Sequence, residues 1–351
     1  MALKNFYNSK KVFVTGQTGF KGAWLSLWLH TLGAKVNGFA LKPEKSSLYY
    51  LIKLNKKVNS YYGNLKNIKK LKEALQKSQP EIIFHLAAQP LVIDSYQDPI
   101  NTFTTNAIGT INLLEAARGV KSIKSIIIIT TDKCYQNKEW DWPYREDDKL
   151  GGHDPYSASK AMAELATESY KKSFFENENI GIATARAGNV IGGGDFGKHR
   201  LIPDIIRSIE NRESLTLRSP DSIRPWQHVL DCLHGYLLLG QHLYKDPQKF
   251  STSFNFGPRE THTVNKITKR LTSEIGFDNK IKTKTGNYHE AKILKLDTSK
   301  SEAMMNWQPF LNINETIKLT SLWYKSYLQK GDLEKESLKH IKVFNKIIHD
   351  N

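Results

Sequence analysis

The chain has 351 residues, 39% of them hydrophobic and 25% charged, with a formal net charge of +16. These values are typical of a globular protein with one large or two modest domains. The positive charge would suit nucleic acid, an acidic membrane surface or an anionic small substrate as a partner. Because no run of five or more basic residues occurs, we interpret most of the charge as a lysine-rich solvated surface and expect no nucleic-acid partner.

The two cysteines, Cys134 and Cys232, lie far apart, and neither belongs to a C-x-x-C or His/Cys cluster. This pattern argues against a disulfide framework and against a zinc site, and it favours a reducing compartment. The sequence has no signal-peptide pattern at its start and no uncharged apolar stretch approaching ~18 residues. We therefore expect a cytoplasmic protein with no metal site and no membrane insertion.

The N-terminal segment is arranged as strand, glycine turn and helix. An apolar run at 12–14 is followed by Gly16, Gly19 and Gly22, and then by apolar residues at helical spacing: Leu25, Trp28, Leu29 and Leu32. Glycines in such a turn let a pyrophosphate approach the helix N-terminus without meeting a Cβ atom. The layout predicts a dinucleotide-binding crossover, although its G-x-x-G-x-x-G spacing differs from the simplest fingerprint.

A second strand is predicted at 34–41, after which dinucleotide-binding folds carry an acidic residue for the adenosine ribose. Lys42 stands where that acid is expected, and Glu44 is the nearest carboxylate. This pattern leaves NAD and NADP both open. A third strand at 58–62 precedes Asn64, whose amide is suited to hydrogen-bond an adenine edge, and a helix follows at about 68–75.

Two further strands end in residues suited to a ligand crevice. The strand at 81–86 ends in the small pair Ala87 and Ala88, which let a flat cofactor lie against the sheet. After a predicted helix at 106–117, the strand that begins at Ser125 stops at the polar residues Thr131, Asp132 and Lys133. Because ligands bind outside the carboxyl ends of parallel strands, these residues should face the crevice. Five strands alternating with helices predict an α/β fold with a doubly wound parallel Rossmann sheet.

The next predicted helix begins at Pro155 and places Tyr156 and Lys160 on one face, because they are four residues apart. A neighbouring ammonium lowers the pKa of a phenol and stabilises the phenolate. A phenolate at neutral pH can take a proton from a sugar hydroxyl. On this spacing alone, an ordinary surface Tyr–Lys pair is the alternative.

Beyond a sixth strand and a glycine-rich loop at 182–195, the pattern becomes irregular and predicts a smaller domain. We expect a dinucleotide-binding domain at 1–190, to which segments near 227–257 return, and an interleaved substrate-binding domain at 191–351. The end of the chain carries Leu338, Ile341, Phe344 and Ile348 on one helical face. This pattern predicts a docked amphipathic helix, with a partner-binding helix as the alternative.

Seven motifs in order give the chain a family resemblance over residues 10–325. They are T-G-Q-T-G-F-K-G at 15–22, H-L-A-A at 85–88, T-D-K-C-Y at 131–135, D-P-Y-S-A-S-K at 154–160, R-A-G-N-V-I-G-G-G-D at 186–195, R-P-W-Q-H-V at 224–229 and N-W-Q-P at 306–309. Together they resemble the extended short-chain dehydrogenases that act on nucleotide sugars. Within that family the chain looks like the 4,6-dehydratases, in particular those that act on CDP-glucose.

The resemblance implies a redox-neutral dehydration with tightly held NAD. Hydride leaves C4 of the glucose while Tyr156 takes the hydroxyl proton, assisted by a hydrogen bond from Thr131 and by the charge of Lys160. Water then leaves across C5 and C6, with Asp132 protonating the departing C6 hydroxyl, and hydride returns to C6.

Lys133 departs from the T-D-E pattern of most relatives, in which a carboxylate abstracts the C5 proton. Because a lysine is a weak base at neutral pH, two roles stay open. Lys133 either abstracts the proton itself, which we favour, or it stabilises the enolate while another group acts as the base.

The resemblance also implies binding residues and an assembly. The expected substrate-binding residues are Gln89, Asn189, Arg200 and Arg224, the last three at the diphosphate. A homodimer or a dimer of dimers would form through the helices at 106–118 and 157–175, using Ala158, Ala161, Met162 and Leu165. The expected cofactor-binding residues are Gly16, Thr18, Gly19, Phe20, Gly22, Asn64, Leu65, Leu86, Ala87, Ala88, Asn106, Tyr156 and Lys160.

Other functions keep the same nucleotide site. The chain could be a dehydratase for dTDP-, UDP- or GDP-linked sugars, or a nucleotide-sugar 4-epimerase. The Asp132–Lys133 pair argues against the epimerase, which needs no acid at C6. A non-catalytic NAD(P)-binding regulator is a remote alternative, since it would leave Tyr156 and Lys160 without a role.

Overall fold

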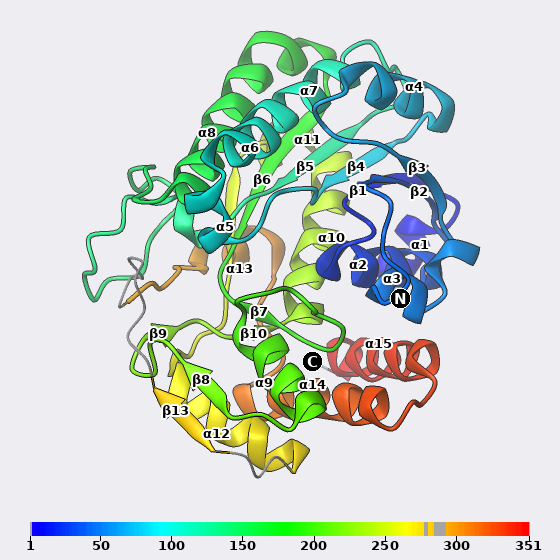
Figure 1. Ribbon diagram of the computed structural model, residues 1–351. Coiled ribbons are helices and arrows are strands. Elements are labelled where there is room, and N and C mark those ends of the chain that lie inside the picture. Colours follow the sequence, from blue (N-terminus) through cyan, green and yellow to red (C-terminus); the bar gives the residue numbers. More distant parts are fainter. Residues whose placement is uncertain (1, 277–279, 284–292, 351) are drawn as a thin grey trace.

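A seven-stranded parallel sheet forms the centre of the molecule (Figure 1). The computed structural model describes residues 2–276, 280–283 and 293–350. The strand order is β11-β6-β5-β4-β1-β2-β3, and every neighbouring pair is parallel, which confirms the predicted doubly wound α/β sheet. The strands are β1 Lys11–Thr15, β2 Lys35–Ala40, β3 Asn59–Tyr62, β4 Ile82–His85, β5 Ser125–Ile129, β6 Gly181–Ala187 and β11 Ser253–Phe256.

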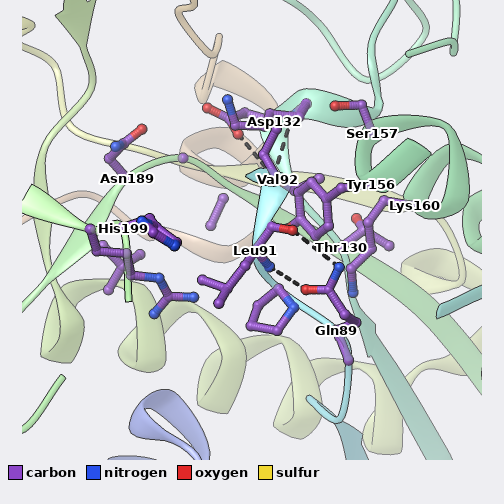
Figure 2. A pocket seen from close by; sticks show the side chains of 18 of the residues that line it. Gln89, Leu91, Val92, Thr130, Asp132, Tyr156, Ser157, Lys160, Asn189 and His199 are labelled. Carbon is purple, nitrogen blue, oxygen red and sulfur yellow. Dashed lines mark hydrogen bonds between the residues drawn. The ribbon is translucent and has the colours of Figure 1, made fainter. Parts of the chain in front are cut away.

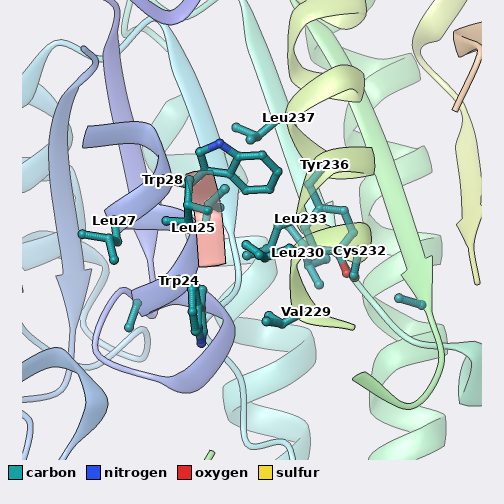
Figure 3. Close-up of a cluster of buried hydrophobic side chains, with 14 of the residues drawn as sticks. Trp24, Leu25, Leu27, Trp28, Val229, Leu230, Cys232, Leu233, Tyr236 and Leu237 are labelled. Atoms are coloured by element: carbon teal, nitrogen blue, oxygen red, sulfur yellow. The ribbon is translucent and has the colours of Figure 1, made fainter. Parts of the chain in front are cut away.

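Helices cover both faces of this sheet, so its inner strands are apolar on both sides. Alternate residues of β5 enter different cores: Ile127 packs in the cluster of α2 and α10, whereas Ile126 packs in the cluster of α4 and α7. Figure 3 shows the first cluster, in which Trp24 and Trp28 of α2 lie opposite Leu233 of α10. The covering helices are α2 Phe20–Thr31, α4 Ile68–Ser78, α7 Gly109–Ala117, α8 Pro155–Tyr170 and α10 Val229–Lys245.

A smaller lobe is built from segments that follow β6. Two-residue strands β7, Val190–Ile191, and β10, Gln227–His228, pair with each other just before α10 returns to the large sheet. Within the segments near 227–257 that were expected to return to the first domain, the helix begins at Val229. The lobe contains α9 Leu201–Asn211, β8 Leu215–Leu217, β9 Ile223–Arg224, β12 His262–Thr263, α12 Val264–Ile275, β13 Ile281–Thr283 and α14 Ile313–Leu328. The domain boundary at residue 190 stays a prediction.

The helix predicted at 106–117 begins earlier and is irregular. Helix α6, Pro99–Phe103, continues through a π-helical segment, Thr104–Ile108, into α7. A π-helical turn shifts the residues that follow it around the helix axis and is frequent beside functional sites. The short elements elsewhere are α1 Ala2–Tyr7, α3 Leu48–Leu51, α5 Val92–Gln97, α11 Pro247–Phe250 and α13 Ser299–Met305.

The C-terminal helix α15, Leu333–Asp350, packs across two parts of the structure (Figure 1). Its Phe344 ring lies 5.6 Å from the ring of Trp28 in α2, and its Ser337 hydroxyl accepts a 2.9 Å hydrogen bond from Trp323 in α14. Its Glu334 forms ion pairs with Lys53 and Lys57 at 2.9 and 2.7 Å. The apolar face of this helix is therefore occupied by the chain itself. In the part of the chain that the structure describes, no helix has the length and apolar character needed to span a bilayer.

Replacing Phe344 by alanine should destabilise the fold by ~3–5 kcal/mol, because the ring is fully buried beside Trp28 of α2 and His234 of α10 and would leave a cavity. The neighbouring Val343 is 41% exposed, so Val343→Ala should change stability by less than ~0.5 kcal/mol. Urea unfolding followed by tryptophan fluorescence measures both. Equal stability of the two variants would show that α15 is not docked as described.

Candidate active site

One cleft of about 1660 Å³ runs along the carboxyl ends of the central strands and into the smaller lobe. It lies where the strand order reverses, between β1 and β4, as expected for a doubly wound sheet. Every predicted site residue except Asn106 lines this cleft. The glycine turn is at one end, residues of α8 and of the segment after β5 are in the middle, and Arg200 and Arg224 belong to the smaller lobe. Figure 2 shows the middle part.

The glycine turn needs glycine at two of its three positions. Gly16 has φ +75°, and a Cβ there would lie 2.8 Å from the backbone nitrogen of Ala87. A Cβ at Gly22 would lie 2.1 Å from the carbonyl oxygen of Gly16. Gly19 is the N-cap of α2 and places no side chain over the N–H groups of the first helical turn. These N–H groups and the helix dipole are suited to bind a phosphate.

No acidic residue lines the described part of the cleft at the end of β2, where the adenosine ribose is expected to bind. Phe39, Ala40 and Leu41 line it at the end of β2, and the Thr18 hydroxyl donates a 3.3 Å hydrogen bond to the Leu41 carbonyl. Lys42 is exposed and does not line it. A ribose here would therefore bind backbone groups and hydroxyls rather than a carboxylate.

Asn106 is not among the residues that line the cleft, and its contact with the cofactor stays a prediction. Its side-chain oxygen accepts a 2.8 Å hydrogen bond from the Gln89 N–H, and its Nδ2 donates to the Gln89 carbonyl at 3.0 Å and to Ser159 Oγ at 2.9 Å. Both amide hydrogens are used, so Asn106 joins the loop after β4 to α8. Gln89 does line the cleft, but its Nε2 donates to the Leu91 carbonyl (Figure 2). The same nitrogen also donates to Thr102 Oγ1.

His85 holds β4 against the glycine turn. Its Nδ1 hydrogen-bonds with Thr15 Oγ1 at 2.7 Å and its Nε2 with Thr110 Oγ1 at 3.2 Å. Thr15 Oγ1 also accepts a 3.1 Å hydrogen bond from the N–H of Ala87. Burial, with a smaller effect of Lys160, lowers the pKa of His85 to about 3. A neutral His85 therefore acts as a structural link between two strands that end at the cleft.

Helix α8 carries Tyr156 and Lys160 into the middle of the cleft (Figure 2). The helix begins as predicted at Pro155, and the Asp154 carboxylate caps it by accepting from the Ser157 N–H at 3.0 Å. Lys160 Nζ donates a 3.0 Å hydrogen bond to the carbonyl oxygen of Ile129 at the end of β5. Burial and the charge of Lys21 lower the pKa of Lys160 to about 8.

Burial raises the pKa of Tyr156 to about 12, although a hydrogen bond with Thr131 and the charge of Arg200 act in the opposite direction. Lys160 Nζ donates to the Ile129 carbonyl, and its role in stabilising a Tyr156 phenolate stays a prediction. Positive charge in the cleft would lower the pKa of Tyr156 and favour its action as a base.

Thr131, Asp132 and Lys133 follow β5 directly, and a short helical turn, Asp132–Cys134, holds them at the cleft. Asp132 is 2% exposed, and its Oδ1 accepts a 3.0 Å hydrogen bond from Thr131. Its Oδ2 has no hydrogen-bond partner among the described residues. Burial raises the pKa of Asp132, while Lys133, Thr131 and Arg224 oppose the shift. Burial of Asp132 therefore shifts its equilibrium toward the protonated form.

In the smaller lobe, the two predicted arginines line the same cleft. Arg200 Nη1 donates to both oxygens of Asp195 at 3.1 Å, which fixes its direction. Arg224 is buried, and its Nη1 donates to the Ile223 carbonyl at 2.9 Å. Asn189 lines the cleft beside the strand pair β7–β10.

The sequence reasoning missed several lining residues. Lys21, inside the motif at 15–22, donates a 2.8 Å hydrogen bond to Tyr236 Oη, and its position next to the third glycine was a usable signal. Arg218 donates to the His199 carbonyl at 2.9 Å and follows a strand, β8, that the sequence did not predict. Within the described residues, no cluster of His, Cys, Asp and Glu side chains is arranged to hold a metal ion.

Known proteins resemble this chain over most of its length. Residues 13–320 match the model of the family described as GDP-mannose 4,6 dehydratase. The chain is 47% identical over 339 residues to the CDP-glucose 4,6-dehydratase of Salmonella typhimurium, covering 94% of both chains. It is 22% identical over 337 residues to the UDP-glucose 4-epimerase of Mycoplasma pneumoniae, covering 91% of this chain and 98% of the relative.

Solved structures show the same fold at lower identity. The UDP-glucose 4-epimerase of Thermotoga maritima superposes with a TM-score of 0.79 at 22% identity, covering 90% of this chain and 99% of that one. The dTDP-glucose 4,6-dehydratase of Streptomyces venezuelae, solved with NAD bound, superposes with a TM-score of 0.79 at 20% identity, covering 92% and 99%. At these identities the likeness shows the Rossmann architecture.

Alanine at Gly22 should destabilise the protein by ~1–3 kcal/mol, because its Cβ would lie 2.1 Å from a backbone carbonyl that cannot move away freely. Gly19→Ala is the matched control, since the nearest atom to its added Cβ is 3.4 Å away. Thermal unfolding of both variants measures the difference. If Gly19→Ala loses as much stability as Gly22→Ala, the described turn geometry is incorrect.

Proposed function

Because the chain belongs to the GDP-mannose 4,6-dehydratase family of extended short-chain dehydrogenases, we propose that it converts CDP-glucose to CDP-4-keto-6-deoxyglucose and water. The observation that carries the choice of substrate is the 47% identity, over 94% of both chains, to a CDP-glucose 4,6-dehydratase. The site supports the same reaction class. A cytoplasmic location for this activity stays a prediction.

The geometry favours a dehydratase over a 4-epimerase. Elimination across C5 and C6 needs a group that protonates the departing C6 hydroxyl, and an epimerase has no such step. Asp132 meets this need, because burial raises its pKa and its Oδ2 has no partner among the described residues. Gly188 leaves space at that oxygen, since a Cβ there would lie 3.0 Å from Asp132 Oδ2.

NAD is the proposed cofactor, and the residues present fit a dinucleotide. The glycine turn offers the phosphate site, Asn64 and Leu65 line the end near β3, and Ala87 and Ala88 leave room along β4. Bound NAD would supply the hydride acceptor and a positively charged ring in the cleft. Identification of the nucleotide released on denaturing the purified protein separates NAD from NADP, and NADP would overturn this choice.

Tyr156 is the proposed base for the C4 hydroxyl. The pKa of about 12 that burial gives it must fall for this role, and positive charge in the cleft acts in that direction, as Arg200 already does. Thr131, which hydrogen-bonds with Tyr156, also lies where it can bind the same hydroxyl. Lys160 would hold the cofactor ribose and contribute its positive charge.

Lys133 is the proposed base for the C5 proton. It lines the cleft next to Asp132, with which it interacts electrostatically, so acid and base belong to consecutive residues. Once C4 is a ketone, the C5 proton becomes acidic and a positioned amine can remove it. Stabilisation of the enolate by the Lys133 ammonium is the alternative role.

The substrate diphosphate is proposed to bind Asn189, Arg200 and Arg224 in the smaller lobe. A guanidinium directed by a carboxylate, as Arg200 is by Asp195, suits phosphate oxygens because its donors are fixed in a plane. Gln89 is proposed to contact the sugar at the opposite wall, with its amide held by Leu91 and Thr102.

We also propose a homodimer through α8 and the helical segment beside it. Met162 and Leu165 of α8 are 45% and 61% exposed, and Ile108 of the π-helical segment, against which α8 packs, is 44% exposed. Ala161, predicted at this face, is buried against Cys134 instead. Light scattering should give a dimer for the wild type and a monomer for Leu165→Glu; a monomeric wild type at micromolar concentration contradicts the proposal.

Incubation with CDP-, dTDP-, UDP- and GDP-linked sugars tests the function itself. Only CDP-glucose should be converted efficiently, to a 4-keto-6-deoxy product identified by mass and by its absorbance in alkali. Tyr156→Phe should lower the rate by ~10²–10⁴, the usual loss for a positioned acid or base. A 4-epimer of the substrate as the product would contradict the dehydratase.

Lys133→Ala should separate the two chemical stages. If Lys133 is the C5 base, CDP-glucose added to this variant should still produce the absorbance of a reduced nicotinamide, while elimination slows by ~10²–10⁴. Tyr156→Phe is the control: because oxidation at C4 is then the slow step, reduced nicotinamide should not accumulate, and product should form only at the rate lowered by ~10²–10⁴. Turnover of Lys133→Ala near the wild-type rate would assign Lys133 the supporting role.

A further inference from the structure

A buried ion pair lies behind the proposed catalytic residues. Glu164 of α8 is 4% exposed and Arg186 of β6 is 3% exposed. Arg186 donates from Nε to Glu164 Oε1 at 3.0 Å and from Nη2 to Oε2 at 2.8 Å. Removing two charges from water is costly and is tolerated only when the remaining donors and acceptors are satisfied. Stability alone therefore does not explain why this ion pair lies in the interior.

The partners of the pair come from several segments. The Glu164 carboxylate also accepts from the hydroxyls of Thr130 and Thr184, the latter at 2.7 Å. Arg186 Nη1 donates to Tyr135 Oη at 2.9 Å and to the Glu146 carbonyl at 2.8 Å. Every oxygen of the carboxylate and both terminal nitrogens of the guanidinium thus have partners, which makes the arrangement rigid.

Two of these partners flank the proposed acid and base. Thr130 directly precedes the segment that contains Asp132 and Lys133, and Tyr135 follows it. Glu164 holds the first end through Thr130, and Arg186 holds the second end through Tyr135, whose hydroxyl also donates to Asn255 at 2.8 Å. The segment between them is thereby fixed at both ends by one ion pair.

Glu164 lies on the same helix as the other two proposed catalytic residues, Tyr156 and Lys160. Glu164 lies one turn beyond Lys160 and two turns beyond Tyr156 on α8. Figure 2 shows Thr130, Asp132, Tyr156 and Lys160 around one space. The ion pair therefore connects two groups of residues. Those on α8 are proposed to act at C4 of the sugar, and those that follow β5 are proposed to act at C5 and C6.

We infer that the Glu164–Arg186 pair is a positioning device that sets Thr131, Asp132 and Lys133 relative to Tyr156 and Lys160. The inference rests on the proposed function. Neither residue lines the cleft, so the pair acts through Thr130, Tyr135 and α8 rather than on the substrate. Its effect should appear in turnover rather than in substrate binding.

The charge of Glu164 has a second consequence for Lys160. Burial and Lys21 lower the pKa of Lys160 to about 8, whereas Glu164 and the Cys134 thiol act to raise it. His85 faces Lys160 from β4 and is neutral at this pH, because its own pKa is about 3. Removing the Glu164 charge should therefore lower the pKa of Lys160 further.

Two threonine variants test the positioning. Thr130→Val removes the hydroxyl that links Glu164 to the catalytic segment, and it should lower kcat by about 10- to 100-fold with KM for CDP-glucose within about twofold, as expected when reacting groups are misplaced. Thr184→Val is the matched control, because it removes a hydroxyl from the same carboxylate on β6, away from that segment. The control should keep kcat within about twofold while losing a similar amount of thermal stability.

Glu164→Gln provides a readout that a merely structural role would not change. The fall of kcat/KM at alkaline pH, where Lys160 loses its proton, should begin at lower pH than in the wild type. An unchanged alkaline limb, or equal losses of kcat in Thr130→Val and Thr184→Val, would overturn the inference. Because the threonine variants leave the ion pair in place, they give a result even if Glu164→Gln does not fold.

The variants and the wild type are assayed with whichever nucleotide sugar the wild type converts. Conversion of a different sugar nucleotide would revise the proposed substrate and leave the positioning test intact. A wild type that converts none of them would contradict the proposed function and this inference with it.

Discussion

The parallel arrangement of the central strands is the constraint on which the site depends. Because β1, β4, β5 and β6 run in the same direction, they all end at one edge of the sheet. Their apolar side chains are used on both faces, so the polar residues can follow only where each strand stops. The glycine turn, the Ala87–Ala88 pair and the Asp132–Lys133 pair meet in one cleft for this reason.

Burial in that cleft also shifts the pKa values of the proposed catalytic side chains. Desolvation disfavours charge, so it raises the pKa of Asp132 and of Tyr156 and lowers that of Lys160. The shift of Asp132 is in the direction that its proposed role needs, because a carboxyl group with a raised pKa keeps its proton more readily for release of water from C6. The consequence for Tyr156 is opposite, since it must lose a proton to act, and it depends on positive charge brought into the cleft.

Local patterns in the sequence predicted most of the sheet and the lining of the cleft, because glycine turns and strand ends are determined by nearby residues. The hydrogen bonds of Asn106 could not be predicted, because only the folded chain shows that its amide is used by Gln89 and Ser159. The Glu164–Arg186 pair was missed for the same reason: the two residues lie on different elements, and nothing in their spacing marks them as partners. The direction of the Lys160 amine could not be predicted either, because it is set by a hydrogen bond to one carbonyl, that of Ile129.

The fate of the C5 proton tests the central claim that this cleft eliminates water across C5 and C6. The wild-type enzyme is incubated with CDP-glucose in D₂O, and the product is analysed by proton NMR before non-enzymatic exchange occurs. Elimination across C5 and C6 predicts one deuterium at C5, because the proton that leaves C5 is replaced from solvent. A 4-keto-6-deoxy product that retains the original hydrogen at C5 would contradict this elimination.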